Sequence, residues 1–141
     1  MSNLNRVYTR SFAIPEEAID ENGHANNVAY VQWMQDVAVE HYAAIGGSEA
    51  QGKDATWMVR EHRIEYLLPA FAGEEIEIRT WVENIRRVRS LRKYEFVRRS
   101  DGKVLVRGET DWVFVDAKSG KPLPIPEQVS KVFSITQESK P

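Results

Sequence analysis

The stretch Asp20-Glu-Asn-Gly-His-Ala-Asn-Asn-Val-Ala-Tyr-Val-Gln-Trp33 joins a crowded polar loop to the start of an apolar segment. Its first eight residues include three side-chain amides, an imidazole and the carboxylate of Asp20. Asn26 or Asn27 is a good helix N-cap, and apolar side chains then recur at helical spacing until the stop signal Gly46-Gly47. The pattern predicts a long helix over about 27–45. Because it is apolar around most of its circumference, we expect it to be central in the fold.

The junction between this loop and helix has a chemical consequence. The first turn of a helix offers unpaired N–H donors and a partial positive charge. A carboxylate beside such donors can attack a carbonyl, or direct water onto it, while the donors stabilise the developing negative charge. Asp20 is therefore a candidate for acyl transfer, although an aspartate in a loop can also simply cap a turn or pair with an arginine.

The rest of the chain has the pattern of β-strands. One strand precedes the helix and four follow it, over residues 6–14, 56–68, 74–85, 91–99 and 104–116. Ser100-Asp101-Gly102 is a hairpin signal between the last two strands, and Gly108 suggests a bulge or a close approach to the helix. The order predicts an α+β fold in which a curved antiparallel sheet of about five strands wraps one long helix.

We expect a single domain over residues 1–141. Its core covers about 6–116, and the tail, 117–141, contains one short helix near 127–133. With 141 residues the chain is long enough for one sizeable core. In 74–85, apolar and charged side chains alternate, so that one face of the sheet is buried and the other exposed; the buried set is Ile76, Ile78, Thr80 and Val82.

Composition argues against several functional classes. The net charge is −2, so no global field recruits nucleic acid or an anionic membrane. The chain has no cysteine, which removes disulfides and thiolate chemistry and agrees with a cytoplasmic location. We expect neither a secretory signal nor a membrane span. The three histidines, His24, His41 and His62, have no metal-ligand spacing, so no metal site is predicted.

The loop and the strands together resemble a known family. The pattern Asp20-x-Asn22-x-His24-x-Asn26-Asn27-Val28-x-Tyr30 is similar to that of plant acyl-carrier-protein thioesterases, and the turn from Asp20 to Gly23 resembles that of the 4-hydroxybenzoyl-CoA thioesterase-like group. Two later segments, Arg63–Ala70 and Gly73–Ile78, resemble the family's second and third strands, and Arg89-Ser90 resembles its Arg/Ser step before the fourth. The chain is thus identified as similar to hotdog-fold thioesterases over about residues 6–116.

This resemblance implies an acyl thioester hydrolase that acts on acyl-CoA or acyl carrier protein in lipid metabolism. In the family the residue at the position of Asp20 is the nucleophile or the general base. A backbone N–H of the first helical turn, here Asn27 or alternatively Val28, polarises the thioester carbonyl. Two subunits form the site between them, as a homodimer or a homotetramer. Coenzyme A is part of the substrate, and no separate cofactor is implied.

The resemblance also suggests roles for other residues. His24 and Asn22 would orient the carboxylate or water, and Asn22 and Asn26 would orient Asp20 or bind the substrate. All three side chains can equally order the loop. Tyr30, Trp57 and Met58 would line an acyl tunnel, or else form plain core. Four residues of the basic segment would bind the carrier's phosphates, unless they form only a solvated hairpin; they are Arg87, Arg89, Ser90 and Arg92.

Two other functions fit the same resemblance. One is a hotdog hydratase or dehydratase, which needs an acid–base pair at the α and β carbons of the acyl group. The other is a non-catalytic acyl-CoA-binding or regulatory protein, which would bind the ligand without turnover.

Overall fold

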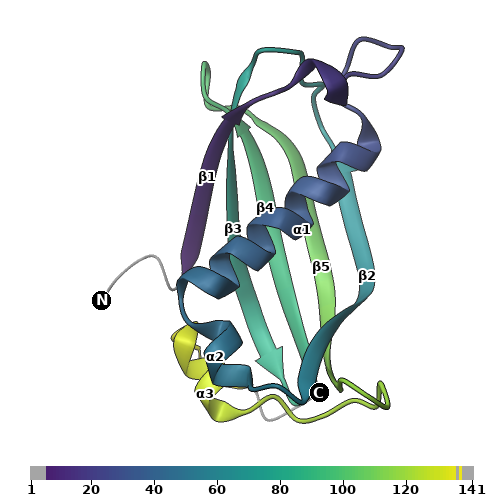
Figure 1. Cartoon of the computed structure of the whole chain (residues 1–141). Helices are drawn as coiled ribbons and strands as arrows, with labels where there is room; N and C mark the ends of the chain where they lie inside the picture. The colour runs from purple at the N-terminus through teal and green to yellow at the C-terminus, as the bar shows by residue number, and fades with distance from the viewer. Residues whose placement is uncertain (1–5, 136, 138–141) are drawn as a thin grey trace.

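The computed structural model describes residues 6–135 and 137. The strands are β1 (Val7–Ala13), β2 (Ala55–Tyr66), β3 (Glu75–Arg86), β4 (Arg89–Arg98) and β5 (Val104–Asp116). The helices are α1 (Asn27–Ala44), α2 (Gly47–Gln51) and α3 (Glu127–Val132), with a 3-10 turn η2 (Glu16–Ala18). All strands form one antiparallel sheet in the order β1-β3-β4-β5-β2, and α1 lies across one of its faces (Figure 1). The predicted α+β architecture is confirmed, with every strand boundary within two residues of its predicted position.

The alternation along β3 shows how the sheet obtains a buried face. The residues that its sequence assigned to the interior are buried at alternate positions; they are Ile76, Ile78, Thr80 and Val82. The register with β4 then shifts between Val82 and Asn84. The extra residue of this bulge returns Ile85 to the buried face.

Helix α1 buries one stripe of its surface against the sheet. The stripe has the spacing of one helical face and consists of Tyr30, Met34, Val37, Ala38 and His41. The opposite side is open, since Val28 is 74% exposed and Val39 is 61% exposed. The burial expected around most of the circumference is therefore found only on the sheet side. No helix in the described residues has both the length and the hydropathy needed to span a membrane.

Two short helices, α2 after α1 and α3 after β5, lie at one end of the sheet (Figure 1). Gly46 has φ 84° and ends α1 where predicted, and α2 starts at the next residue. The segment after β5 turns back: the Leu123 N–H donates to the Phe114 carbonyl at 2.9 Å, and the Ile125 N–H donates to the Arg87 carbonyl at 2.7 Å. This segment carries α3 to the same end of the molecule as α2 (Figure 1).

Gly108 of β5 lies directly against Met34 of α1. It pairs regularly with Ile64 and Tyr94, so no bulge lies at this residue. A Cβ atom here would lie 2.8 Å from Sδ and 3.1 Å from Cε of Met34, a fully buried side chain of α1. A methyl group here would therefore require the Met34 side chain to shift, and glycine avoids that shift.

We expect Gly108→Ala to lower the free energy of unfolding by about 1–3 kcal/mol, the usual cost of overpacking a core. Urea unfolding measures this change. In a Met34→Ala background the added methyl group gains room, so its cost should fall, as a double-mutant cycle would show. An equal cost in both backgrounds would contradict the proposed contact.

Candidate active site

The loop that carries Asp20 is closed at its base, beside the start of α1. An antiparallel bridge joins Ile19 to Ala25. The Asn26 N–H donates to the Ala18 carbonyl at 2.7 Å. Because Asn26 is also the N-cap residue of α1, the loop and the helix start form one connected unit.

The Asp20 carboxylate organises this loop from within. Its Oδ1 accepts the N–H of Asn22 at 2.9 Å and that of His24 at 3.3 Å. The Asp20 carbonyl accepts the Gly23 N–H at 3.0 Å, and Gly23 has the left-handed φ of +80° that this turn needs. Within the described residues, Oδ2 has no hydrogen bond, and Asp20 is half-buried. One oxygen of a positioned carboxylate therefore stays available.

The first turn of α1 has two occupied amides and one open amide. The Asn26 side chain accepts the Val28 N–H at 2.7 Å, which is the N-cap bond. The Ala29 N–H donates to the Asn26 carbonyl at 3.0 Å. In the described part of the chain, the Asn27 N–H has no acceptor. Of the two amides that the sequence offered as oxyanion donors, Asn27 is thus the one that the structure leaves open.

His24 and Asn22 are both exposed on the loop. The His24 ring lies edge-on against Phe71, with ring centroids 5.4 Å apart and an interplanar angle of 84°. The hydrogen bonds of Asn22 and His24 to the Asp20 carboxylate are donated by their backbone N–H groups. Both residues therefore fix the carboxylate by their backbone, and their side chains are free to meet a ligand.

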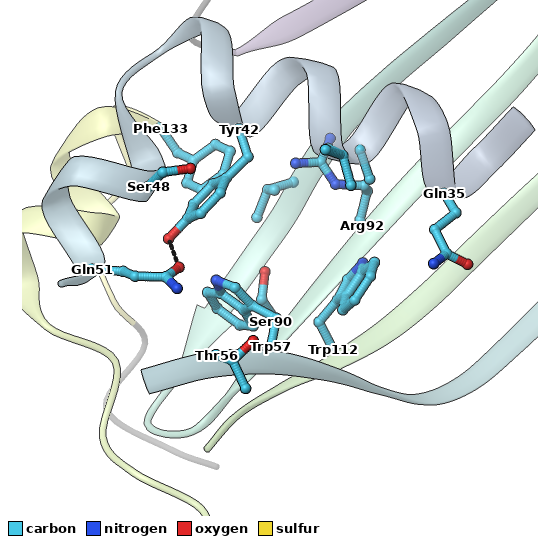
Figure 2. Close-up of a pocket in the computed structure, with 13 residues that line it drawn as sticks. Gln35, Tyr42, Ser48, Gln51, Thr56, Trp57, Ser90, Arg92, Trp112 and Phe133 are labelled. Carbon is cyan, nitrogen blue, oxygen red and sulfur yellow. Dashed lines mark hydrogen bonds between the residues drawn. The ribbon is translucent and has the colours of Figure 1, made fainter. Parts of the chain in front are cut away.

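A cavity of about 330 Å³ lies under the other half of α1 (Figure 2). Its walls combine four aromatic side chains with polar groups of the sheet, and they include Tyr42, Trp57, Trp112, Phe133, Ser90 and Arg92. No residue of the Asp20 loop lines it. The lining residues of α1 run from Gln35 to Tyr42, which at 1.5 Å per residue lie roughly 12 to 22 Å along the helix from Asn27. Loop and cavity are therefore distant within one chain.

The three predicted acyl-contacting residues lie in different places. Tyr30 is 3% exposed in the core, where its ring meets Trp33 and Phe96 edge-on. Burial raises the pKa of Tyr30 to about 12, so it remains a neutral phenol. Trp57 lines the cavity. Met58, the next residue on β2, is 53% exposed. Of the three, only Trp57 contributes to the cavity.

The four residues predicted to bind phosphate are divided between two environments. Arg87 is exposed at the β3–β4 turn, with φ 48°. The guanidinium of Arg89 donates to both carboxylate oxygens of Asp111, at 3.2 and 2.5 Å, and these bonds raise the pKa of Arg89. Ser90 and Arg92 are buried and line the cavity. The structure therefore does not gather the four side chains into one cluster.

Sequence reasoning did not identify Tyr42, Trp112 and Phe133 as neighbours in a cavity. They come from α1, β5 and the end of α3, and only the tertiary fold brings them together. One signal was available: period-2 alternation along β4 places Ser90 and Arg92 on the same face as the core aromatics of that strand.

Comparisons with known proteins support the assignment of the fold. The family model of the thioesterase-like superfamily matches residues 14–133. Among curated proteins, the chain is similar to the chloroplastic acyl-[acyl-carrier-protein] hydrolase FATB2 of Cuphea viscosissima, with 23% identity over 133 residues. The match covers 89% of this chain but 32% of the plant protein, so the chain spans about a third of the length of that curated relative.

Solved structures show the same architecture. A DHNA-CoA thioesterase from Staphylococcus aureus superposes with a TM-score of 0.79 at 21% identity, covering 89% of this chain and 90% of that one. An acyl-ACP thioesterase from Bacteroides thetaiotaomicron gives a TM-score of 0.80 at 23% identity, covering 87% of this chain and 51% of that one. At such identities the likeness concerns the fold, and the predicted hotdog fold is confirmed.

We expect Asn26→Ala to destabilise the protein by about 1 kcal/mol, because it removes the acceptor of the Val28 N–H. Asn27→Ala is the matched control: its side chain makes no hydrogen bond within the described residues, and alanine is the better helix former. Urea unfolding of both variants checks the expectation. Equal loss of stability in the two would contradict the role of Asn26 as the cap.

Proposed function

The chain belongs to the thioesterase-like superfamily, and from this premise we propose that it hydrolyses acyl thioesters to a carboxylic acid and a thiol. One observation carries the assignment of the site. A carboxylate with a free oxygen is fixed in a loop that ends at the N-cap of α1, and the Asn27 N–H at that helix start has no acceptor within the described residues.

In the proposed reaction, the thioester carbonyl carbon is attacked by Asp20 or by a water molecule that Asp20 deprotonates. The carbonyl oxygen then gains negative charge, which the Asn27 N–H and the positive end of α1 stabilise. Collapse of the intermediate breaks the C–S bond and expels the thiolate, which takes up a proton. In the nucleophilic route, water then cleaves the acyl–Asp20 anhydride and regenerates the carboxylate.

We propose coenzyme A or a phosphopantetheine carrier as the thiol part of the substrate. Both carry phosphate groups, which guanidinium groups bind well. Arg87 is exposed at the hairpin turn and has no ion pair in the described part of the chain, whereas Arg89 is already paired with Asp111. Arg87 is therefore the residue of the predicted phosphate-binding set that is best placed to meet a phosphate.

We propose that a second copy of the chain pairs along β2. This strand bonds to β5 on one side only, and its other edge is unpaired within the chain. Exposed apolar side chains follow that edge and its end: Met58 at 53%, Val59 at 37%, Tyr66 at 47% and Phe71 at 45%. Antiparallel pairing of β2 with its copy would extend the sheet and cover these side chains.

The same pairing would complete the active site. α1 starts near the end of β2 (Figure 1), and Thr56 and Trp57 at the start of β2 line the cavity. The segment after β2 touches the Asp20 loop, because the Ala25 N–H donates to the Ala70 carbonyl at 2.9 Å. In an antiparallel copy, that segment would approach Trp57, which lines the cavity. The carboxylate of one subunit would then face the cavity of the other.

We expect Asp20→Asn to reduce thiol release from acyl-CoA esters by at least about a hundredfold, the scale of a lost catalytic base. Ligand affinity should be kept, because asparagine retains an oxygen that can accept the two loop N–H groups. Glu21→Gln, at the exposed neighbouring position, is the control and should be fully active.

Thiol release across short, long and aromatic acyl-CoA esters measures this loss, and calorimetry measures binding. Unchanged hydrolysis in Asp20→Asn would reject Asp20 as the catalytic group. Binding without hydrolysis in the unaltered protein would instead indicate a non-catalytic acyl-CoA-binding protein, and hydration of enoyl thioesters would indicate a hydratase.

We expect Val59→Lys to shift the protein from dimer towards monomer, because it places charges on both sides of a two-fold β2 interface. Thr9→Lys, exposed on the opposite edge strand β1, is the matched control and should stay dimeric. Sedimentation velocity distinguishes the two states. If Thr9→Lys and not Val59→Lys dissociates the protein, the interface lies at β1.

A further inference from the structure

A buried arginine lies against the cavity without an acid to neutralise it. Arg92 is 3% exposed, and its Nη1 donates to Nδ1 of His41 at 2.9 Å and to Oγ1 of Thr80 at 3.0 Å. Its guanidinium lies 5.7 Å from the ring centroid of Phe133. Within residues 6–135 and 137, no carboxylate pairs with it. A guanidinium has five donors, so Nε and Nη2 keep donors that these bonds do not use.

Arg92 stays charged despite its burial. Burial lowers its pKa to about 10, which is still well above neutral pH. A guanidinium cannot accept a hydrogen bond, so Nδ1 of His41 is unprotonated and acts as the acceptor. The Thr80 hydroxyl donates a hydrogen bond to the Lys93 carbonyl at 2.9 Å. Neither partner supplies a negative charge, and burying an uncompensated charge is costly.

Two more unmatched donors line the same cavity. Nε1 of Trp57 and Nε1 of Trp112 are, in the described part of the chain, the buried side-chain polar atoms without a hydrogen-bond partner. The Trp57 indole lies near the Tyr42 phenol, and the Trp112 indole lies near the Tyr94 phenol. Burial raises the pKa of both phenols, and each indole offsets part of that rise. Neither contact, however, reaches hydrogen-bond geometry.

Figure 2 shows Arg92, Trp57 and Trp112 around one hollow between α1 and the sheet. Protein interiors seldom leave buried donors unmatched. Here an arginine and two tryptophans whose indole N–H groups are unmatched line a single cavity, and none of these donor groups can accept a hydrogen bond. Such a set of donors fits a ligand that brings acceptor oxygens and a negative charge.

We propose that this cavity is the acyl subsite and that Arg92 binds an anionic oxygen at the end of the acyl group remote from the thioester. The proposal rests on the proposed thioesterase function. It narrows the substrate to thioesters of compact acids that carry a second carboxylate or another anionic oxygen. A volume of about 330 Å³ suits such a group, and the rings of Trp57, Trp112 and Phe133 would pack against its body.

Because two of the cavity residues are tryptophans, their fluorescence can report ligand binding without any turnover. Tryptophan fluorescence is followed during titration with benzoate and with benzyl alcohol, a neutral probe of similar size. We expect benzoate to bind more tightly. Arg92→Met should weaken benzoate binding by at least about tenfold, the scale of a lost charged hydrogen bond, and should leave benzyl alcohol binding unchanged. Arg79→Met, an exposed arginine of β3, is the matched control and should change neither affinity.

Three outcomes would overturn the subsite. The first is that Arg92→Met and the unaltered protein bind benzoate equally well, and the second is that the protein shows no preference for benzoate over benzyl alcohol. The third is that adenosine 3′,5′-bisphosphate, in place of benzoate, binds in a way that depends on Arg92. The last result would assign Arg92 to the phosphates of coenzyme A. If Arg92→Met does not fold, Trp112→Phe decides, since it keeps a ring but removes one donor: weaker benzoate binding supports the subsite, and unchanged binding rejects it.

Hydrolysis separates this proposal from the one on which it rests. Glutaryl-CoA is compared with valeryl-CoA, which has the same chain length without the terminal carboxylate. Arg92→Met should lower kcat/KM for glutaryl-CoA by at least about tenfold more than it lowers kcat/KM for valeryl-CoA. Arg92-dependent benzoate binding without any hydrolysis would refute the hydrolase and retain the anion subsite. Hydrolysis that is indifferent to Arg92 for both esters would refute the subsite alone.

Discussion

The structure depends on the packing of one helix against one face of a five-stranded sheet. Met34 of α1 meets β5 at Gly108, where even a methyl group would not fit without a shift. Around this contact lies the larger hydrophobic cluster, built from α1 and from the buried faces of β3, β4 and β5.

Further along α1, the interior changes character. The second hydrophobic cluster involves α3 and the ends of β3 and β5. Between the two clusters, the helix and sheet enclose His41, Thr80 and Arg92, all of them buried. The cavity opens here. A helix that packs tightly near its start and encloses polar groups near its end provides both a rigid core and a place for a ligand.

The two ends of α1 thus have complementary chemistry. At its start are an open amide and a carboxylate that is held by its own loop. Towards its end is a buried cation with no acid beside it in the described residues. One chain cannot bring these ends together, because the helix itself separates them. Two chains that pair in opposite directions along β2 can do so, which links the proposed assembly to the proposed chemistry.

The sequence by itself determined the local structure. The N-cap at Asn26, the stop at Gly46 and the alternation in β3 are short-range effects of side-chain hydrogen bonding, backbone freedom and polarity, so the elements and their order followed from the pattern. The resemblance of the Asp20 loop to one family likewise rests on adjacent residues. Local patterns predicted side-chain exposure less well: Val28, Val39 and Met58 are exposed. The reason is that exposure depends on which other elements cover each face.

Only the tertiary structure decided which side chains share a site. Arg87, Arg89, Ser90 and Arg92 form one basic segment in the sequence, yet strand alternation and the cover provided by α1 send the last two inwards and leave the first two outside. Likewise Trp57, Trp112 and Phe133 meet at one cavity although they lie far apart along the chain. The physical reason is that a binding site is made by contacts between distant segments, and these exist only after the helix has packed onto the sheet.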